Sequence, residues 1–172
     1  MLGCPAYTLG RVYAYQIASW TGFFSVAAGV AATLTGLIFV AVSINLSRVL
    51  EFPPLADRAA ESLMQMFGAL IVSMCALLPG QSRLIIGVEL ALVGLILWVL
   101  QTLLQYRSYS IEHPRPFISI ALSQLSAAAL FVAGISLATE TLGGLYWLAA
   151  GIILSVTVGV SNAWVLLVEI LR

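Results

Sequence analysis

The sequence predicts an all-α membrane protein in which five transmembrane helices form a compact bundle. Hydrophobic residues make up 62% of the chain and charged residues only 8%, whereas soluble domains average about 45–50% and about 25%. From Trp20 to Leu46 the chain carries no ionisable side chain, and this run exceeds the roughly 20 helical residues that cross a bilayer core. A soluble domain of 172 residues is too small to bury such a helix, so lipid is the expected surrounding.

The first predicted helix covers residues 20–47 and follows an aromatic segment, residues 1–19. Tyr7, Tyr13, Tyr15 and Trp20 lie in or directly after this segment, and such rings are enriched at the membrane–water interface. We therefore expect the segment to lie at headgroup depth. No charged leader and no small-residue cleavage site is evident, so we expect the first helix to stay in the mature protein.

Four more helices are expected at residues 59–78, 83–106, 116–139 and 144–171, each bounded by charges, proline or glycine. Pro53 and Pro54 are expected to act as a stop signal before the second helix. The short connection PGQS makes the second and third helices an antiparallel hairpin. All five helices belong to one transmembrane domain, and no basic tail or low-complexity tract indicates nucleic-acid binding.

Arginine placement predicts the orientation of the bundle. All basic residues are arginines, and five spans divide them into Arg48, Arg58, Arg107, Arg115 and Arg172 on one side and Arg11 and Arg83 on the other. Because arginine-rich loops stay in the cytoplasm, the N-terminus is expected outside and the C-terminus inside.

Small residues follow one face of the first predicted helix in steps of three and four. We call this set the Gly29 face: Gly22, Ser25, Gly29, Ala32 and Gly36. Lipid gives no hydrophobic reward for bringing helices together, so close packing of small residues has to hold them. The face predicts a helix contact, either within the chain or with another subunit or membrane partner. Thr33 and Thr35 are expected to return their hydroxyls to carbonyls one turn earlier.

The fifth predicted helix repeats this pattern at intervals of four. Its small residues, which we call the Gly159 face, are Gly151, Ser155, Gly159 and Ala163. The fourth helix offers Ser119, Ser123 and Ala127 at a similar spacing. The same two alternatives, packing inside the chain and contact between subunits, apply to these faces.

Polar side chains inside the spans are costly and usually face protein or water. Glu89 lies about 9 Å along the third helix from Arg83, and Ser155, Asn162 and Glu169 repeat every seven residues on the fifth. Two further polar residues, near the cytoplasmic ends of their helices, are expected neighbours of this stripe: Asn45 and Gln65.

These polar residues allow two interpretations. In the first, Asn45, Gln65 and Asn162 form hydrogen bonds between helices, and Glu169 pairs with Arg172. In the second, Glu89 and Asn162 line a permeation or proton path.

The sequence predicts no catalytic residue, no metal site and no cofactor. The single histidine, His113, lies in the loop RSYSIEHPRP, so the chain has no pair of imidazoles for a metal. No Lys or His stands at membrane depth to activate a serine. Cys4 and Cys75 both fall toward the outer side, where a disulfide could survive, although Cys75 also reads as a small apolar helix residue.

The runs AATLTGLIFVAVSINLSRVL, LLPGQS and NAWVLLVEILR resemble a group of small bacterial integral membrane proteins, some of which are labelled modulator of FtsH protease. The resemblance covers the first three helices and the last. It implies a bacterial inner-membrane location and a role in membrane-protein quality control, and it brings no catalytic residues.

We therefore expect a non-enzymatic, homo-oligomeric protein that binds membrane partners or itself through small-residue faces. The alternative is a small oligomeric channel or transporter that uses Glu89 and the Asn162 face.

Overall fold

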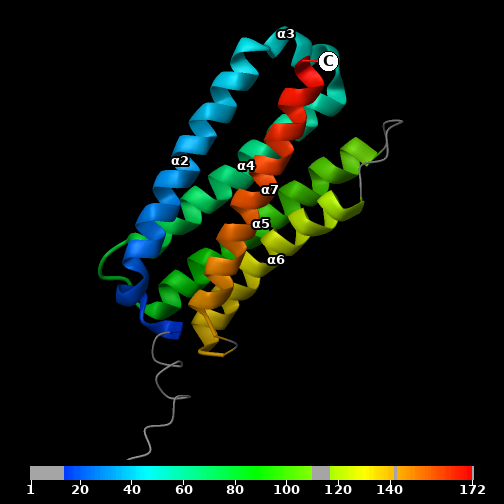
Figure 1. The fold of residues 1–172 in the computed structure, drawn as a ribbon. Helices are drawn as coiled ribbons and strands as arrows, with labels where there is room; N and C mark the ends of the chain where they lie inside the picture. Colours follow the sequence, from blue (N-terminus) through cyan, green and yellow to red (C-terminus); the bar gives the residue numbers. More distant parts are fainter. Residues whose placement is uncertain (1–13, 110–116, 142, 172) are drawn as a thin grey trace, which may run out of the picture.

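The computed structural model describes residues 14–109, 117–141 and 143–171, and the long elements in this part of the chain are helices (Figure 1). The elements in order are η1 (Ile17–Trp20), α2 (Thr21–Ile44), α3 (Leu46–Glu51), α4 (Pro53–Leu77), α5 (Arg83–Tyr109), α6 (Phe117–Thr139) and α7 (Leu145–Leu171). Among the described residues, five helices are long and apolar enough to cross a membrane: η1 with α2, and then α4, α5, α6 and α7. The predicted bundle of five transmembrane helices is confirmed.

Two helix boundaries differ from the prediction. The second spanning helix begins at Pro53 and not at residue 59, because proline is well suited to the first turn of a helix, where its missing N–H is not needed. Pro53 and Pro54 thus start α4. The first helix ends at Ile44 and not at residue 47, since Asn45 adopts φ −107° and ψ 21° and separates α2 from the short α3. The other three helices agree with the prediction to within one turn.

The helix α4 lies at the centre of the bundle. It packs against α2, α5 and α7, while α6 packs against α5 and α7. The short helix α3 and the C-terminal end of α7 lie at one end of the molecule, which we call the α3 end. The opposite end, the η1 end, holds η1 and the turns that precede α5 and α7 (Figure 1).

The largest apolar core cluster occupies the half of the bundle near the η1 end. Its members come from the N-terminal halves of α2, α5 and α7 and from the C-terminal halves of α4 and α6. The buried residues of this cluster are Phe24, Ala27, Ala31, Ala69, Val72, Ala76, Ile86, Leu90, Leu130, Ala133, Leu137, Leu145, Leu148 and Ile152. We call them the apolar core.

Glycines bring α5 and α6 into close contact. A Cβ atom added to Gly87 would lie 2.7 Å from the backbone nitrogen of Ala138, and one added to Gly94 would lie 2.7 Å from that of Phe131. From the other side, a Cβ on Gly134 would collide with the backbone of Ala91. Only glycine lets the two backbones approach this closely. The sequence analysis did not single out this crossing.

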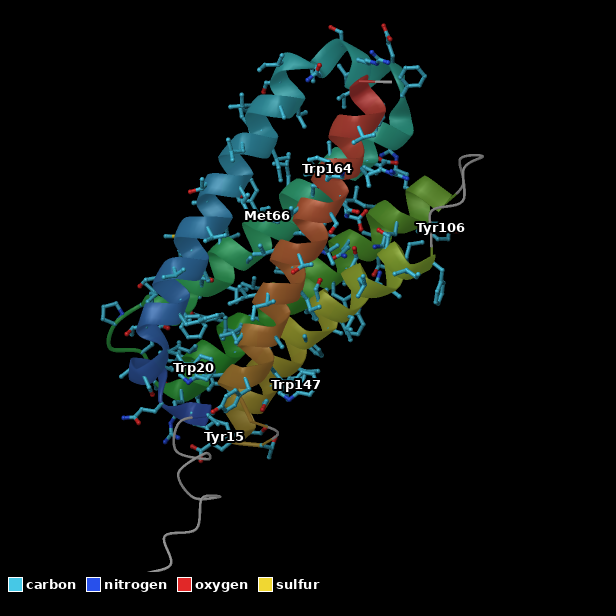
Figure 2. All side chains as sticks on the ribbon, in the orientation of Figure 1. Tyr15, Trp20, Met66, Tyr106, Trp147 and Trp164 are labelled. Atoms are coloured by element: carbon cyan, nitrogen blue, oxygen red, sulfur yellow. The ribbon has the colours of Figure 1, made fainter. Side chains whose placement is uncertain are left out.

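The described part of the aromatic N-terminal segment packs on the η1 end of the bundle. The Gly143 N–H donates to the Tyr15 hydroxyl at 3.0 Å, and the Trp20 ring meets Tyr146 edge to face with centroids 5.0 Å apart. Tyr7 and Tyr13 lie outside the described residues. Figure 2 shows Tyr15, Trp20 and Trp147 near this end and Trp164 and Tyr106 toward the other, an arrangement typical of aromatic belts at two membrane interfaces.

The α5–α6 crossing generates a stability prediction. Replacing Gly134 by Leu should lower the free energy of unfolding by about 1–3 kcal/mol or more, because the new side chain overpacks the contact with Ala91. The measurement is SDS titration of the protein in mixed micelles. Ala121→Leu, an exposed position on the same helix, is the matched control and should leave stability close to that of the wild type. Equal stability of both variants would contradict the close crossing.

Candidate functional site

The Gly29 face points away from the rest of the chain. A Cβ atom added to Gly22, Gly29 or Gly36 would meet no atom within 4 Å, and Ser25 and Ala32 are exposed. The helix α2 turns a different face to the bundle, formed by Phe24, Ala27, Ala31, Thr35 and Ile38. Packing inside the chain, one of the two alternatives for this face, is therefore not found among the described residues. Contact with another subunit or partner stays a prediction.

The polar groups of α2 are satisfied within the helix itself. Thr33 Oγ1 donates to the Gly29 carbonyl at 2.8 Å, and Thr35 Oγ1 donates to the Ala31 carbonyl at 2.7 Å, as predicted. The Gly29 face consequently presents small side chains and bare backbone, without an unpaired hydroxyl from these two threonines. Such a surface favours close approach of another helix over hydrogen bonding to a polar ligand.

The Gly159 face of α7, in contrast, packs inside the chain. A Cβ on Gly151 would lie 2.7 Å from Leu130 Cδ2, and one on Gly159 would lie 3.3 Å from Gln65 Cβ and would collide with the end of the Met66 side chain. Ser155 between them is buried, and Ala163 is half-buried. Figure 2 shows Met66 near the middle of the molecule, where α4 passes α7. The packing alternative is confirmed for Gly151, Ser155 and Gly159.

The glycines of the other helices show how unusual α2 is. Each of them would place an added Cβ within contact distance of another helix; they are Gly68, Gly87, Gly94, Gly134, Gly151 and Gly159. The three glycines of α2 are the described helical glycines without such a neighbour. In this chain a helical glycine therefore marks a helix contact, except on the Gly29 face.

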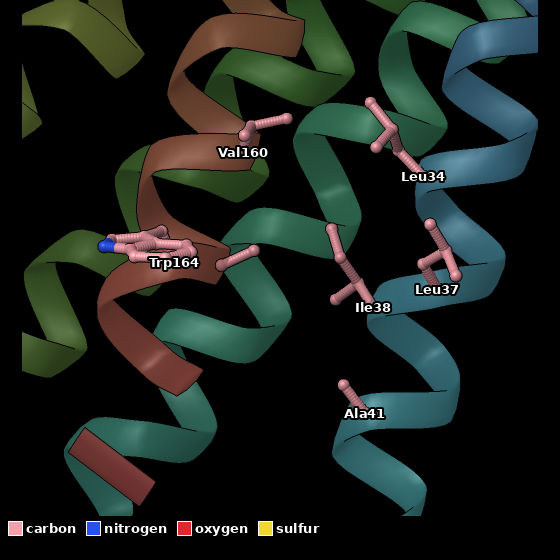
Figure 3. Close-up of a pocket in the computed structure, with 7 residues that line it drawn as sticks. Leu34, Leu37, Ile38, Ala41, Val160 and Trp164 are labelled. Carbon is pink, nitrogen blue, oxygen red and sulfur yellow. The ribbon is translucent and has the colours of Figure 1, made fainter. Parts of the chain in front are cut away.

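A second exposed feature of α2 is an apolar cleft that it forms with α7 toward the α3 end. Its lining consists of Leu34, Leu37, Ile38, Ala41, Val160, Ala163 and Trp164. Figure 3 shows these side chains on the two facing helices, with α4 behind them. The walls are almost entirely apolar, so the cleft suits hydrocarbon and has no group for acid–base or charge-based chemistry.

A polar cluster lies in the core between the apolar core and the α3 end. Glu61 of α4 is only 2% exposed, and its Oε1 accepts hydrogen bonds from Gln105 Nε2 and Ser123 Oγ, both at 2.9 Å. By helical rise, Glu61 lies about 9 Å from Leu55, where the apolar span of α4 begins. A carboxyl group at this depth is costly unless neighbouring helices supply hydrogen bonds. This role of Glu61 was not predicted from the sequence.

Further hydrogen bonds join α5 and α6 around Gln124. Its Nε2 donates to Gln105 Oε1 at 2.6 Å, and its Oε1 accepts from the Trp98 indole N–H at 2.5 Å. Thr102 Oγ1 lies 3.2 Å from the Gln124 amide nitrogen and accepts from it. The carboxyl group of Glu61 is thereby linked through Gln105 to a chain of side-chain hydrogen bonds between two helices.

Three serines on one face of α6 connect this region to α4 and α7. Ser123 donates to Glu61, Ser126 Oγ donates to Gln65 Oε1 at 3.2 Å, and Ser119 Oγ donates to Asn162 Oδ1 at 3.3 Å. Several donors nearby have no protein acceptor, namely Ser62 Oγ, Gln65 Nε2, Gln101 Nε2 and Asn162 Nδ2. We call the following set the Glu61 cluster: Glu61, Ser62, Gln65, Gln101, Gln105, Ser123, Gln124 and Ser126.

The polar residues that were expected to lie next to one another lie at different places in the structure. Gln65 belongs to the Glu61 cluster and Asn162 lies beside it, so interhelical hydrogen bonding is confirmed for these two. Asn45, which lies between α2 and α3, instead donates to the Ala41 carbonyl of α2 at 2.9 Å. The side chain of Glu169, and its expected partner Arg172, lie outside the described part.

Glu89 lies apart from the cluster, toward the η1 end. Both of its carboxylate oxygens accept from Gln81 Nε2, at 3.0 and 3.1 Å. Gln81 belongs to the turn before α5, so Glu89 caps the α4–α5 hairpin instead of joining the polar stripe of α7. Arg83, at the start of the same helix, forms an ion pair with Glu140 at 2.8 Å.

The remaining residues considered from the sequence are the metal-ligating side chains, the single histidine and the two cysteines. Within the described ranges, no three His, Cys, Asp or Glu side chains come together in a way that could hold a metal ion. His113 and Cys4 lie outside those ranges, and Cys75 is half-buried in α4. No protein-family model, no curated protein and no solved structure matches this chain.

The Glu61 cluster generates a second stability prediction. Ser123→Ala removes a hydrogen bond to a buried carboxyl group and should lower the free energy of unfolding by about 1–2 kcal/mol. Ser161→Ala is the matched control, because Ser161 is exposed and donates only to the Thr157 carbonyl of its own helix. Unfolding in mixed micelles measures both variants, and an equal effect would show that the Ser123 contact contributes no specific stability.

Proposed function

We propose that this protein is a non-enzymatic membrane protein that associates laterally with another transmembrane helix through the Gly29 face. The observation that carries the proposal is the absence of any neighbour within 4 Å of the Cβ positions of Gly22, Gly29 and Gly36 among the described residues. The other helical glycines of the chain are used for helix contacts. Like the faces that carry those glycines, the Gly29 face consists of small residues three or four positions apart. Among the described residues, however, no other helix packs against it.

A second copy of the chain is the proposed partner. A face of small residues is self-complementary, because two such faces can meet about a two-fold axis without side chains intervening. Contact between backbones then supplies dispersion and weak Cα–H···O interactions that lipid tails cannot match in geometry. The large exposed side chains elsewhere on α2, such as Val26 at 67%, do not permit such an approach.

The resemblance to proteins labelled modulator of FtsH protease supports a bacterial inner-membrane location and a role in membrane-protein quality control. In that setting, α2 would bind a second copy of the chain or a helix of another membrane protein. Other proteins of the same membrane would then recognise this complex. Arginine placement supports the proposed orientation: Arg48, Arg58 and Arg107 belong to the α3 end, and Arg83 to the η1 end. The α3 end is then cytoplasmic.

The alternative, a channel or transporter that uses Glu89 and Asn162, has less support. Along their helices, Glu89 is about 9 Å from Arg83 and Asn162 about 26 Å from Leu145, so the two lie at different depths. The apolar core occupies the half of the bundle around Glu89. A continuous polar path through one chain would have to cross this packed apolar region.

The proposed orientation predicts the result of cysteine labelling. A cysteine placed beside Gln81 should react with an impermeant maleimide added outside intact spheroplasts, whereas one beside His113 should react only after the membrane is opened. The control is a chain that lacks Cys4 and Cys75. The reverse pattern would refute the orientation but not the five spans.

Assembly provides the direct test of the Gly29 face. Gly29→Leu should abolish the oligomer, because a large side chain holds the two backbones apart. It should leave the stability of the single chain almost unchanged, since a Cβ atom at this position meets no other atom within 4 Å. Mass measurement in lipid nanodiscs reports the assembly size, and SDS titration reports the stability.

Ala150→Leu is the matched control, because it adds the same bulk at an exposed position of α7. This variant should keep the assembly size of the wild type. An unchanged oligomer in Gly29→Leu would show that the Gly29 face contacts lipid, and a loss in both variants would show that the effect is not specific to this face.

A further inference from the structure

We propose that the apolar cleft between α2 and α7 binds one acyl chain of a zwitterionic phospholipid that carries an amine, with the headgroup of this lipid against α3. We call this site the α2–α7 cleft. It is independent of lateral association through the Gly29 face, because the cleft residues and the Gly29 face lie on different sides of α2.

The cleft forms where α2 and α7 pack on α4 without filling the space between them. Near the η1 end the two helices are joined, since the Trp20 ring contacts Tyr146. Toward the α3 end, the walls run from Leu34 to Ala41 on α2 and from Val160 to Trp164 on α7, with α4 behind them (Figure 3). Small side chains at this level, such as that of Ala41, leave the two walls apart.

The size and the apolar walls of the cleft determine the chemistry of the occupant. The cleft has a volume of about 180 Å³, and an apolar cavity of roughly 150 Å³ stays dry and holds a molecule of the size of benzene. A helix segment about 10 Å long, as long as the α2 wall, displaces on the order of 800 Å³ and is too large to enter. Empty space would deprive the walls of dispersion contacts, so a flexible hydrocarbon chain suits the cleft best.

Charged residues at the same end of the molecule indicate the headgroup. Ala41 lies one turn before Asn45, and α3 follows directly with Arg48 and Glu51. Both charged side chains are exposed, and neither forms an ion pair within the described part of the chain. Arginine binds phosphate through two parallel N–H groups, and a carboxylate accepts hydrogen bonds from an ammonium group. The two charges therefore complement a headgroup that carries both a phosphate and an amine.

Photolabelling of the full chain in lipid nanodiscs tests the proposal. The probe is phosphatidylethanolamine with a diazirine in one acyl chain, diluted into unlabelled lipid, and mass spectrometry of peptides locates the adducts. Both walls of the cleft should be labelled severalfold more than Leu92 and Ile96 of α5. These two residues are 55% and 56% exposed and report ordinary contact with lipid.

Filling the cleft should remove this signal. Ala41→Leu adds bulk to the α2 wall and should lower labelling of the cleft severalfold. Ser43→Leu is the matched control, because this exposed position lies on nearly the opposite side of the helix, and it should leave the labelling unchanged. Ala163→Leu repeats the test from the α7 wall, so that a folding defect in Ala41→Leu does not decide the result. Gly29→Leu should keep the labelling of the wild type.

A diacylglycerol probe with the same acyl chains tests the headgroup. In the wild type it should label the cleft severalfold less than the phospholipid probe does. Arg48→Gln should lower labelling by the phospholipid probe to the level of the diacylglycerol probe.

Three outcomes would overturn the proposal. Equal labelling of the cleft and of the two α5 positions, unaffected by Ala41→Leu, would show only passing contact with lipid. A cleft without lipid adducts, in an oligomer that Ala41→Leu dissociates, would show that a second copy of the chain occupies it. Equal labelling by the two probes in the wild type would refute the assignment of the headgroup.

Discussion

The bundle depends on close approach of helix backbones at small residues. Helices surrounded by lipid gain no hydrophobic free energy from meeting each other, so stability has to come from contact geometry and internal hydrogen bonds. Gly87, Gly94 and Gly134 allow the α5–α6 crossing, and Gly151 and Gly159 seat α7 against α6 and α4. The same requirement makes the uncovered Gly29 face informative, because it offers this geometry outside the chain.

The core combines a large apolar cluster near the η1 end with a polar cluster nearer the α3 end. Near the η1 end, side chains such as Phe24, Leu90 and Leu148 pack as in the interior of a soluble protein. Toward the α3 end, Gln105 of α5 and Ser123 of α6 both donate hydrogen bonds to Glu61 of α4. Each such hydrogen bond in lipid contributes on the order of 1 kcal/mol. Because its donor and acceptor must meet at one distance, it also favours one register of α4, α5 and α6.

The spans could be predicted from the sequence because apolar length alone determines which segments cross a bilayer. The sequence could not predict the rotation of each helix about its own axis, which determines the face that points into the bundle. On α2, both the Gly29 face and the face of Phe24 and Ile38 follow helical spacing, and nothing in an apolar sequence says which one meets α4. The buried face combines Phe24 and Ile38 with the small residues Ala27 and Ala31, and large side chains such as Leu37 are exposed, so side-chain size alone does not identify the face that meets α4. The boundary at Pro53 was missed because proline both ends and begins helices.

The Glu61 cluster left a signal in the sequence that was overlooked. Glu61 and Gln65 are four residues apart, as are Gln101 and Gln105, and Ser119, Ser123 and Ser126 share a face. Each pair taken alone does not identify a buried cluster, since residues such as Gln65 and Ser126 come from different helices that lie far apart in the sequence. They form a buried polar cluster because the fold brings them together at one depth of the bundle. Glu89 drew attention for its depth in the helix, yet its partner Gln81 lies in the turn, which sequence spacing does not reveal.

Cysteine crosslinking in native membranes tests the central claim most directly, because it reports what touches α2 and a cysteine is small enough to keep the shape of the Gly29 face. In a chain that lacks Cys4 and Cys75, a cysteine at Ala32, on that face, should form a disulfide-linked dimer on mild oxidation. A cysteine at Val30, which is exposed on a different face of α2, should stay monomeric. Dimer formation at Ala32 alone is the result that the account predicts, and the absence of a dimer at both positions would contradict it.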